Sequence, residues 1–264
     1  MNDYLRMLEK AKAWVREVGQ IQLEGLTQTL TVETKSSRFD PVTNIDTQSE
    51  AVLIARIKEE YPGHAVLSEE AGVLGGTSDY LWIIDPLDGT VNYAHGYPIF
   101  SISLALQYCG EIVFGLVYAP ALKELFEGVK GGGAYLNGTR LRVAETQELS
   151  KAVLATGFPY DKAADPDNNL NYFNHLVPQI SGIRRSGSAA FDLCNVAAGR
   201  LDGYWELKVN RWDIAAGALF VKEAGGEVIY LPSKKGISLI AGNERICNLI
   251  HQELVRMNPS LSSG

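Results

Sequence analysis

The sequence is short of cysteine, of basic clusters and of long apolar runs, and each shortage excludes a class of protein. Its three cysteines, Cys109, Cys194 and Cys247, are odd in number, far apart and without CxxC spacing, which argues against a disulfide framework and favours reduced, buried thiols. Lys and Arg never run longer than two in a row and the formal net charge is −7, so a broad nucleic-acid-binding surface is not expected. No apolar run approaches the roughly 18 residues of a membrane span, and the charged N-terminal segment lacks the pattern of a signal peptide. We therefore expect a soluble cytoplasmic protein.

The sequence does contain a large apolar fraction arranged in helical and strand patterns. With 264 residues, 46% of them hydrophobic, the chain can bury a large core in one domain or in two closely joined halves. An amphipathic pattern predicts a helix over residues 2–25. A second helix is predicted to open at the capping-box spacing of residues 47–50, just after Asp46, and to stop at Pro62-Gly63. Between them lies a polar loop, 35–41, of the kind that can close over a ligand.

Strand patterns dominate the rest of the first half. They predict short strands near residues 65–68 and 81–84, followed by an antiparallel meander with strands near 100–107, 112–118 and 123–127 and a hairpin turn at Asn137-Gly138. Farther along, strands and helices alternate, which predicts a second, mixed sheet with helices packed on it. We place the division so that residues 1–148 form the first half, 149–257 form the second half, and 258–264 form a disordered tail.

Carboxylates stand at the ends of two predicted strands. One strand runs into Asp85-Pro86-Leu87-Asp88-Gly89-Thr90, and another runs into Glu69-Glu70. Adjacent side chains on an extended segment face opposite ways, so at most one of these two glutamates can enter a shared site, and the pattern alone does not choose between them. A further acid, Asp213, opens a helix in the second half. On its own, Asp46 is interpreted as a helix-capping acid.

This grouping of acids predicts metal-assisted chemistry on a phosphate. Clustered carboxylates repel one another unless a cation joins them, and carboxylate oxygen is a ligand that Mg²⁺ prefers. Because Mg²⁺ takes only one or two carboxylates, four acids imply more than one ion. Two ions could activate an attacking water and stabilise the leaving oxygen of an in-line displacement. The turn at Gly89-Thr90 could hold the anion through backbone N–H groups.

Five motifs in this order resemble those of the inositol monophosphatase family of Mg²⁺-dependent, lithium-sensitive phosphatases, over nearly the whole chain. The motifs cover residues 40–46 (DPVTNID), 68–70 (SEE), 82–92 (WIIDPLDGTVN), 187–190 (GSAA) and 212–217 (WDIAAG). The resemblance implies an α+β layered sandwich of alternating helix and sheet layers (αβαβα), usually assembled as a homodimer. It implies two to three Mg²⁺ ions per site. The substrate it implies is a small-molecule phosphate monoester, with myo-inositol 1-phosphate as the expected one.

The resemblance also assigns roles to individual residues. It selects Glu69 over Glu70 as a metal ligand and a member of the catalytic set, and it gives one ion Glu69, Asp85 and the Leu87 carbonyl. A second ion would take Asp85, Asp88 and Asp213, and a weaker third ion would share Glu69. Thr90, hydrogen-bonded to Asp46, would orient the attacking water. Lys35 would lie in a mobile loop over the site, and the substrate would contact Asp88, Gly89, Thr90, Gly187, Ser188, Ala189 and Glu206.

Several alternatives remain open on the same residues. The site could instead serve fructose 1,6-bisphosphate, histidinol phosphate or a 3′-phosphorylated nucleotide, since a fold does not fix a substrate. Arg184 and Arg185 could contact a second anionic group, although solvated or dimer-surface positions are the more ordinary interpretation for arginines. A role in binding RNA polymerase complexes is the alternative from another class, and no basic stripe supports it.

Overall fold

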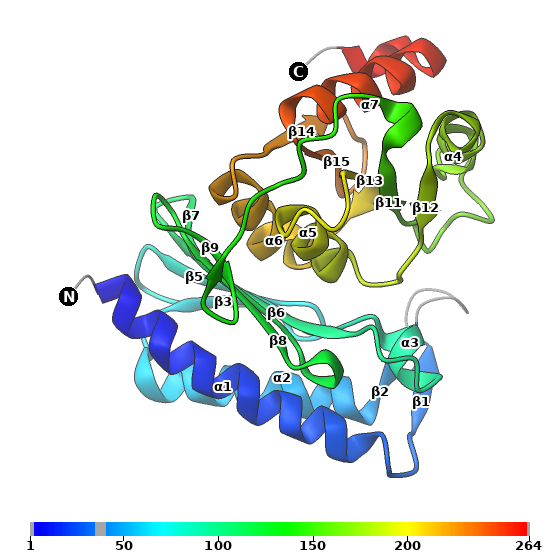
Figure 1. Cartoon of the computed structure of the whole chain (residues 1–264). Coiled ribbons are helices and arrows are strands. Elements are labelled where there is room, and N and C mark those ends of the chain that lie inside the picture. The colour runs from blue at the N-terminus through cyan, green and yellow to red at the C-terminus, as the bar shows by residue number, and fades with distance from the viewer. Residues whose placement is uncertain (1–2, 35–40, 263–264) are drawn as a thin grey trace.

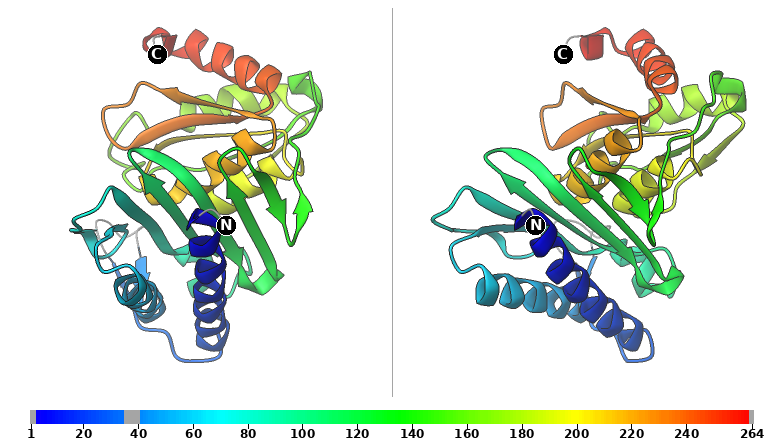
Figure 2. Two further views of the ribbon diagram at one scale, coloured as in Figure 1. Left: turned by 90° about the vertical axis from the view of Figure 1, so that its left-hand side faces the viewer. Right: turned by 60° about the vertical axis from the view of Figure 1, so that its left-hand side comes forward.

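The computed structural model describes residues 3–34 and 41–262, which form five stacked layers. The first layer holds two helices, α1 (Asp3–Gly25) and α2 (Asn44–Glu60), side by side beneath an eight-stranded sheet (Figure 1). The helices α5 (Ala189–Ala197) and α6 (Arg211–Glu223) lie between this sheet and a five-stranded one, as both views in Figure 2 show. The outer layer consists of α4 (Leu170–Leu176) and α7 (Glu244–Met257). The predicted αβαβα sandwich is thereby confirmed.

The eight-stranded sheet has the order β10-β9-β8-β7-β6-β5-β3-β4. Its strands are β3 (Ala65–Ser68), β4 (Gly72–Leu74), β5 (Tyr80–Asp88), β6 (Ser101–Tyr108), β7 (Glu111–Ala119), β8 (Glu124–Val129), β9 (Gly133–Leu136) and β10 (Thr139–Arg140). From β5 to β10 each strand pairs antiparallel with the next, as the predicted meander requires. At the other end of the sheet, β3 pairs parallel with β5, because β4 runs back antiparallel beside β3 before the chain enters β5 on the other side of β3.

Both faces of this sheet are covered, so side chains alternate between two cores. Trp82 and Ile84 pack toward α1 and α2 with Trp14, whereas Ile83 between them packs toward α5 and α6. Burial of an aromatic side chain such as Trp82 contributes on the order of 3 kcal/mol. The alternation fixes the register of β5 and therefore the direction in which the acids at its end point.

The five-stranded sheet has the order β12-β11-β13-β15-β14. Its strands are β11 (Val153–Thr156), β12 (Gly182–Arg184), β13 (Gly203–Val209), β14 (Glu227–Leu231) and β15 (Ile237–Gly242). The β11–β12 and β11–β13 pairs are parallel and the β13–β15 and β14–β15 pairs are antiparallel, so the sheet is mixed, as predicted. A small ribbon of β1 (Val32–Thr34) and β2 (Pro41–Thr43) and the short helix α3 (Thr90–Ala94) complete the regular structure near the site.

Two sequence-based predictions about local structure are wrong, and one strand was missed. The capping box of α2 consists of Thr43 and Asp46, not of residues 47–50, so Asp46 lies in the first turn and not ahead of the helix. The strand β14 was not predicted. Residues 259–262 of the predicted disordered tail form a 3₁₀ turn that buries Leu261 against the core beneath α7. No helix among residues 3–34 and 41–262 is both long and apolar enough to span a membrane.

Candidate active site

The site is a cavity where the carboxyl end of β5 faces the second half of the chain. Parallel pairing of Ser68 with Ile84 places the residues that follow β3 and β5 at one edge of the sheet. Residues from both halves line the cavity, among them Glu69, Asp85, Leu87, Asp88, Gly89, Thr90, Gly187, Ser188, Ala189, Glu206 and Asp213. The structure thus brings together all but two of the residues proposed from the sequence. Lys35 lies outside the described residues, and Asp46 is buried beside Thr90.

The structure distinguishes the two neighbouring glutamates. Glu69 lines the cavity and Glu70 does not. The turn that presents Glu69 is held by Glu50 of α2, whose carboxylate accepts hydrogen bonds from the Glu70 and Ala71 amides, both at 3.0 Å, and from the Ser68 hydroxyl. Because Glu50 is occupied in this way, it is not available as the partner in the capping box predicted at residues 47–50.

Three of the acids are fixed by hydrogen bonds to other groups of the protein. Asp85 accepts from the Leu87 amide at 3.0 Å, and Asp213 accepts from the Asn210 amide at 2.6 Å at the start of α6. Asp88 accepts from the Ser188 hydroxyl at 2.6 Å and from the Ala190 amide at 2.8 Å. The N-terminus of α5 is therefore tied to the end of β5 through one carboxylate.

Burial and mutual repulsion raise the pKa values of these acids. The pKa of Asp85 is well above its usual range, first because the group is buried and then because Glu69, Asp88 and Asp213 are near. The pKa of Asp213 is raised by burial, then by Asp88 and Glu69. Burial raises the pKa of Asp88 to about 6, even though the Ser188 and Ala190 hydrogen bonds oppose the increase. Acids that resist ionisation in this way favour a cation among them.

The donor set fits a hard divalent cation. It consists of carboxylate oxygens from three separate segments and the main-chain oxygen of Leu87, and the described residues that line the cavity include no thiol or imidazole. In the part of the chain that the structure describes, no three acidic, imidazole or thiol side chains already converge as a complete chelating group. The cavity therefore contains oxygen donors of the kind that Mg²⁺ prefers.

Thr90 and Asp46 make the contact expected of a catalytic pair. The Thr90 hydroxyl lies 2.8 Å from Asp46 Oδ1 and 3.1 Å from the Leu87 carbonyl oxygen. The other oxygen of Asp46, Oδ2, accepts from the Thr43 amide at 2.8 Å and from the Thr43 hydroxyl at 2.5 Å. Asp46 is fully buried. The Asp46 carboxylate therefore caps α2 through one oxygen and accepts a hydrogen bond from Thr90 through the other.

Gly89 has a backbone conformation that few other residues would adopt. Its φ is +96°, and a Cβ there would lie 3.0 Å from the Ile99 carbonyl oxygen and 3.3 Å from that of Gly187. Gly187 also has a positive φ, +91°. The two glycines let the β5–α3 turn and the segment before α5 approach each other, which places Ser188 against Asp88.

Glu206 of β13 contributes a further acid to the lining of the cavity. It receives a short hydrogen bond from the Tyr204 hydroxyl. Burial raises its pKa to about 7, and the Tyr204 bond and the charge of Arg185 only partly offset this increase. Arg185 lines the cavity, whereas the guanidinium of Arg184 donates to its own strand at Ile183. Of the two arginines, the structure therefore places Arg185 alone at the site.

The raised pKa of Glu206 gives a prediction about stability. A carboxyl group with a raised folded-state pKa contributes its full stability below its unfolded value of 4.5, and this contribution is lost as the pH rises to about 7. We expect the unfolding free energy of the chelator-treated wild type to fall by at most about 3 kcal/mol over this pH range because of Glu206. In Glu206→Gln this part of the decrease should be absent. Urea unfolding at pH 5 and pH 8 would measure it. Equal losses in the wild type and the variant would contradict the assignment.

Sequence reasoning missed several residues that shape the site. Phe158, Pro159 and Tyr160 line the cavity, and the motifs gave no signal for them. Gln22 of α1 is fully buried and donates at 2.8 Å to the Pro86 carbonyl oxygen within the metal motif. A glutamine on the apolar face of an amphipathic helix was the one available signal, because a buried amide needs partners.

The fold and the cavity define a layered α+β protein of the phosphatase class. The chain belongs to the inositol monophosphatase family, whose model matches residues 3–257. It is 44% identical over 229 residues to the Nus factor SuhB of Pseudomonas aeruginosa, which covers 84% of each chain. It is also 44% identical over 225 residues to the inositol-1-monophosphatase of Synechocystis, which covers 84% of this chain and 78% of that one.

Solved structures agree with this assignment. The inositol monophosphatase of Anabaena superposes with a TM-score of 0.86 at 40% identity, covering 97% of both chains. A structure described as an IMPase/NADP phosphatase complexed with Mg²⁺ and phosphate superposes with a TM-score of 0.82 at 26% identity and covers 95% of each chain. The relatives therefore carry both phosphatase and Nus-factor names.

Proposed function

We propose that this protein hydrolyses a phosphate monoester, with myo-inositol 1-phosphate as its substrate, in a Mg²⁺-dependent reaction. The observation that carries the proposal is the cavity in which Asp85, Asp88 and Asp213 come together with raised pKa values next to the Thr90–Asp46 pair. This arrangement offers cation ligands and a proton acceptor at one place. A homodimer, which the family resemblance implies, is part of the same proposal.

The metal ligands in this proposal are protein oxygens that line the cavity. Glu69, Asp85 and the Leu87 carbonyl would hold one Mg²⁺, and Asp85, Asp88 and Asp213 a second, with Glu69 shared by a weaker third. When bound, Mg²⁺ lowers the pKa of water and neutralises charge that develops on the phosphate. The Mg²⁺ in the IMPase/NADP phosphatase structure supports this choice of metal.

The protein's own groups would orient the reaction. Since the Thr90 hydroxyl donates a hydrogen bond to Asp46, the lone pairs of its oxygen would be directed to accept a hydrogen bond from the attacking water. Asp46, held at its second oxygen by Thr43, keeps Thr90 in this orientation. The backbone N–H groups of Gly89 and Thr90 would hold the phosphate for in-line attack, which is mainly a matter of positioning.

Selection among phosphate esters would fall to the side of the cavity formed by α5 and β13. A carboxylate that accepts two substrate hydroxyls rejects analogues lacking them, because it would otherwise be buried without partners. Glu206 and Asp88 are the carboxylates placed for this, with Gly187, Ser188 and Ala189 beside them. The polyhydroxylated ring of inositol 1-phosphate matches these acceptors.

Two alternatives have specific observations in their favour. Arg185 at the cavity favours a substrate with a second anionic group, such as fructose 1,6-bisphosphate, over histidinol phosphate or a 3′-phosphorylated nucleotide. The Nus-factor name of the Pseudomonas relative favours binding to a transcription complex in addition to, or instead of, hydrolysis. If Asp88→Asn kept full cellular function without hydrolysis, the binding role would be the relevant one.

A substrate panel tests the proposal. We expect release of phosphate from inositol 1-phosphate with Mg²⁺, little release after treatment with a chelator, and inhibition by Li⁺, with the other three phosphate esters hydrolysed more slowly. A malachite-green assay with equal substrate concentrations would measure the rates, and re-added Mg²⁺ is the control for damage by the chelator. A strong preference for histidinol phosphate over inositol 1-phosphate would overturn the choice of substrate.

A further inference from the structure

One wall of the cavity is a loop that the sequence motifs do not include. The loop between β11 and α4, residues 157–169, is called the rim loop here, and its residues 158–160 line the cavity. Its ends are joined by Asn169, whose amide nitrogen donates to the Gly157 carbonyl at 2.6 Å and to the Thr156 hydroxyl at 2.8 Å. The amide oxygen accepts from Trp205 Nε1 at 2.7 Å, so the base of the rim loop is fixed beside β13.

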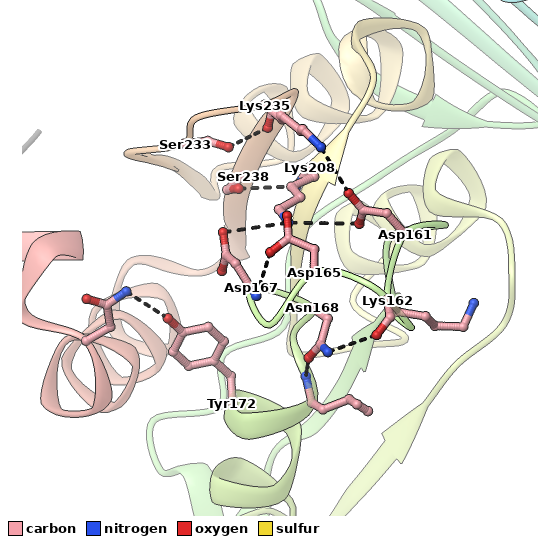
Figure 3. A network of polar contacts seen from close by, with 12 residues as sticks. Asp161, Lys162, Asp165, Asp167, Asn168, Tyr172, Lys208, Ser233, Lys235 and Ser238 are labelled. Atoms are coloured by element: carbon pink, nitrogen blue, oxygen red, sulfur yellow. Dashed lines mark hydrogen bonds and ion pairs between the residues drawn. The ribbon is translucent and has the colours of Figure 1, made fainter. Parts of the chain in front are cut away.

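Lys208 of β13 holds the rest of the rim loop. Its side chain is only 7% exposed, and its Nζ lies 2.8 Å from Asp165 Oδ2, 3.8 Å from Asp167 Oδ2 and 3.9 Å from Asp161 Oδ1 (Figure 3). All three carboxylates belong to the rim loop. A lysine buried this far needs paired charge, and three carboxylates of one loop lie close enough to supply it.

The backbone at Lys208 is unusual for a lysine. Its φ is +60°, in the left-handed region, where the pairing of β13 with β15 shifts register between Glu206 and Val209. The Lys208 amide donates to the Ser238 hydroxyl at 3.2 Å, and Gly236 approaches so closely that a Cβ on it would lie 2.8 Å from the Lys208 carbonyl carbon. This conformation is kept by the surrounding structure and directs the side chain to the rim loop.

We propose that Lys208 is a positioning residue for substrate binding, which holds the rim loop against the cavity and thereby sets the affinity for the phosphate ester. Lys208 follows Glu206 by two residues in β13. The strand that carries a proposed substrate contact therefore also holds the rim loop. The kinetic part of the inference rests on the proposed phosphatase function. The structural part, that Lys208 orders the rim loop, does not.

Lys235 provides a matched control. It approaches the same group of carboxylates, with its Nζ 3.4 Å from Asp161 Oδ2, but its side chain is 70% exposed (Figure 3). Exposed ion pairs contribute little, whereas removing the partner of a buried charge costs much more. Loss of either lysine changes the net charge equally, so a difference between them isolates the buried contact.

The test compares Lys208→Met, Lys208→Arg, Asp165→Asn and Lys235→Met in the full chain. For Lys208→Met we expect KM for inositol 1-phosphate to rise about 10-fold and kcat to stay within about twofold, with Lys208→Arg closer to the wild type. Asp165→Asn should also raise KM. The double variant should have the same KM as Lys208→Met alone, because both substitutions remove the same contact. Lys235→Met should behave as the wild type.

Hydrogen exchange measured by mass spectrometry gives a second measurement that does not depend on hydrolysis. Peptides covering residues 158–168 should exchange about 10-fold faster in Lys208→Met than in Lys235→Met, while peptides from the eight-stranded sheet stay unchanged. Unchanged KM and unchanged exchange in Lys208→Met would overturn the inference. A lower kcat in this variant together with faster exchange in the eight-stranded sheet would also overturn it. If exchange increases while the wild type hydrolyses no phosphate ester, the proposed function fails and the ordering role of Lys208 stands.

Discussion

Asp213→Asn is expected to reduce kcat/KM by roughly 10³-fold, because it removes an ionic ligand from the centre that would stabilise the transition state. Asp213 is the carboxylate that the second half contributes to the acid cluster with Asp85 and Asp88, and an amide oxygen carries no net charge to replace it. Steady-state hydrolysis of inositol 1-phosphate at saturating Mg²⁺ measures the loss. Wild-type turnover in this variant would refute the proposed metal ligands.

The same substitution should not weaken the metal-free fold. The pKa of Asp213 is raised by burial and by the nearby acids, so a neutral side chain relieves repulsion. The asparagine oxygen can still accept the hydrogen bond from the Asn210 amide that opens α6. We therefore expect the melting temperature of the chelator-treated variant to equal or exceed that of the wild type.

Asp202→Asn is the matched control for charge. Asp202 accepts a hydrogen bond from the Val153 amide at 2.6 Å in the second sheet but does not line the cavity. Its substitution keeps a backbone acceptor and removes one charge, as Asp213→Asn does. Full activity in Asp202→Asn with loss in Asp213→Asn would show that position, and not net charge, determines the effect.

Thr90→Ala is expected to reduce kcat by about 10²-fold or more with little change in KM. The substitution removes the hydroxyl that lies 2.8 Å from Asp46 Oδ1, and with it the proposed acceptor for the attacking water. The Asp46 carboxylate would keep its bonds to Thr43, so the first turn of α2 should persist. A free energy of unfolding lower by about 1–3 kcal/mol is expected, since a buried acceptor loses a donor.

Thr90→Ser provides the conservative comparison for this prediction. Serine keeps the hydroxyl and loses only a methyl group, so most of kcat should return. Rates measured at several substrate concentrations separate kcat from KM for the two variants. An unchanged kcat in Thr90→Ala, or an equal loss in Thr90→Ser, would show that the hydroxyl does not act on the attacking water.

Short-range patterns predicted the meander strands and the place where the acids meet, whereas the order of the layers was predicted from the family resemblance. Period-two alternation specified β6 and β7, and two apolar segments ending in acids pointed to a common sheet edge. That edge depends on the parallel pairing of β3 with β5, which alternation alone does not determine. The family motifs, not the pattern, favoured Glu69, and the turn held by Glu50 explains the choice physically.

The remaining features depend on contacts between distant parts of the chain. Two overlapping cap signals, Thr43 to Asp46 and residues 47–50, compete at the start of α2, and the first prevails because Glu50 is engaged by the turn after β3. Nothing in the sequence around Lys208 indicates that its side chain is buried and paired. Its partners are three acids earlier in the chain, of which Asp165 is separated from it by 43 residues. Such pairings cannot be inferred from local periodicity.

The measurement that tests the central claim most directly is a calorimetric titration of Mg²⁺ into the chelator-stripped wild type and into Asp213→Asn. The account predicts saturable binding to the wild type, markedly weaker binding to Asp213→Asn, and hydrolysis of inositol 1-phosphate that rises over the same range of Mg²⁺ concentration as binding. Equal binding by the two proteins, or hydrolysis by the stripped wild type at its full rate, would contradict it.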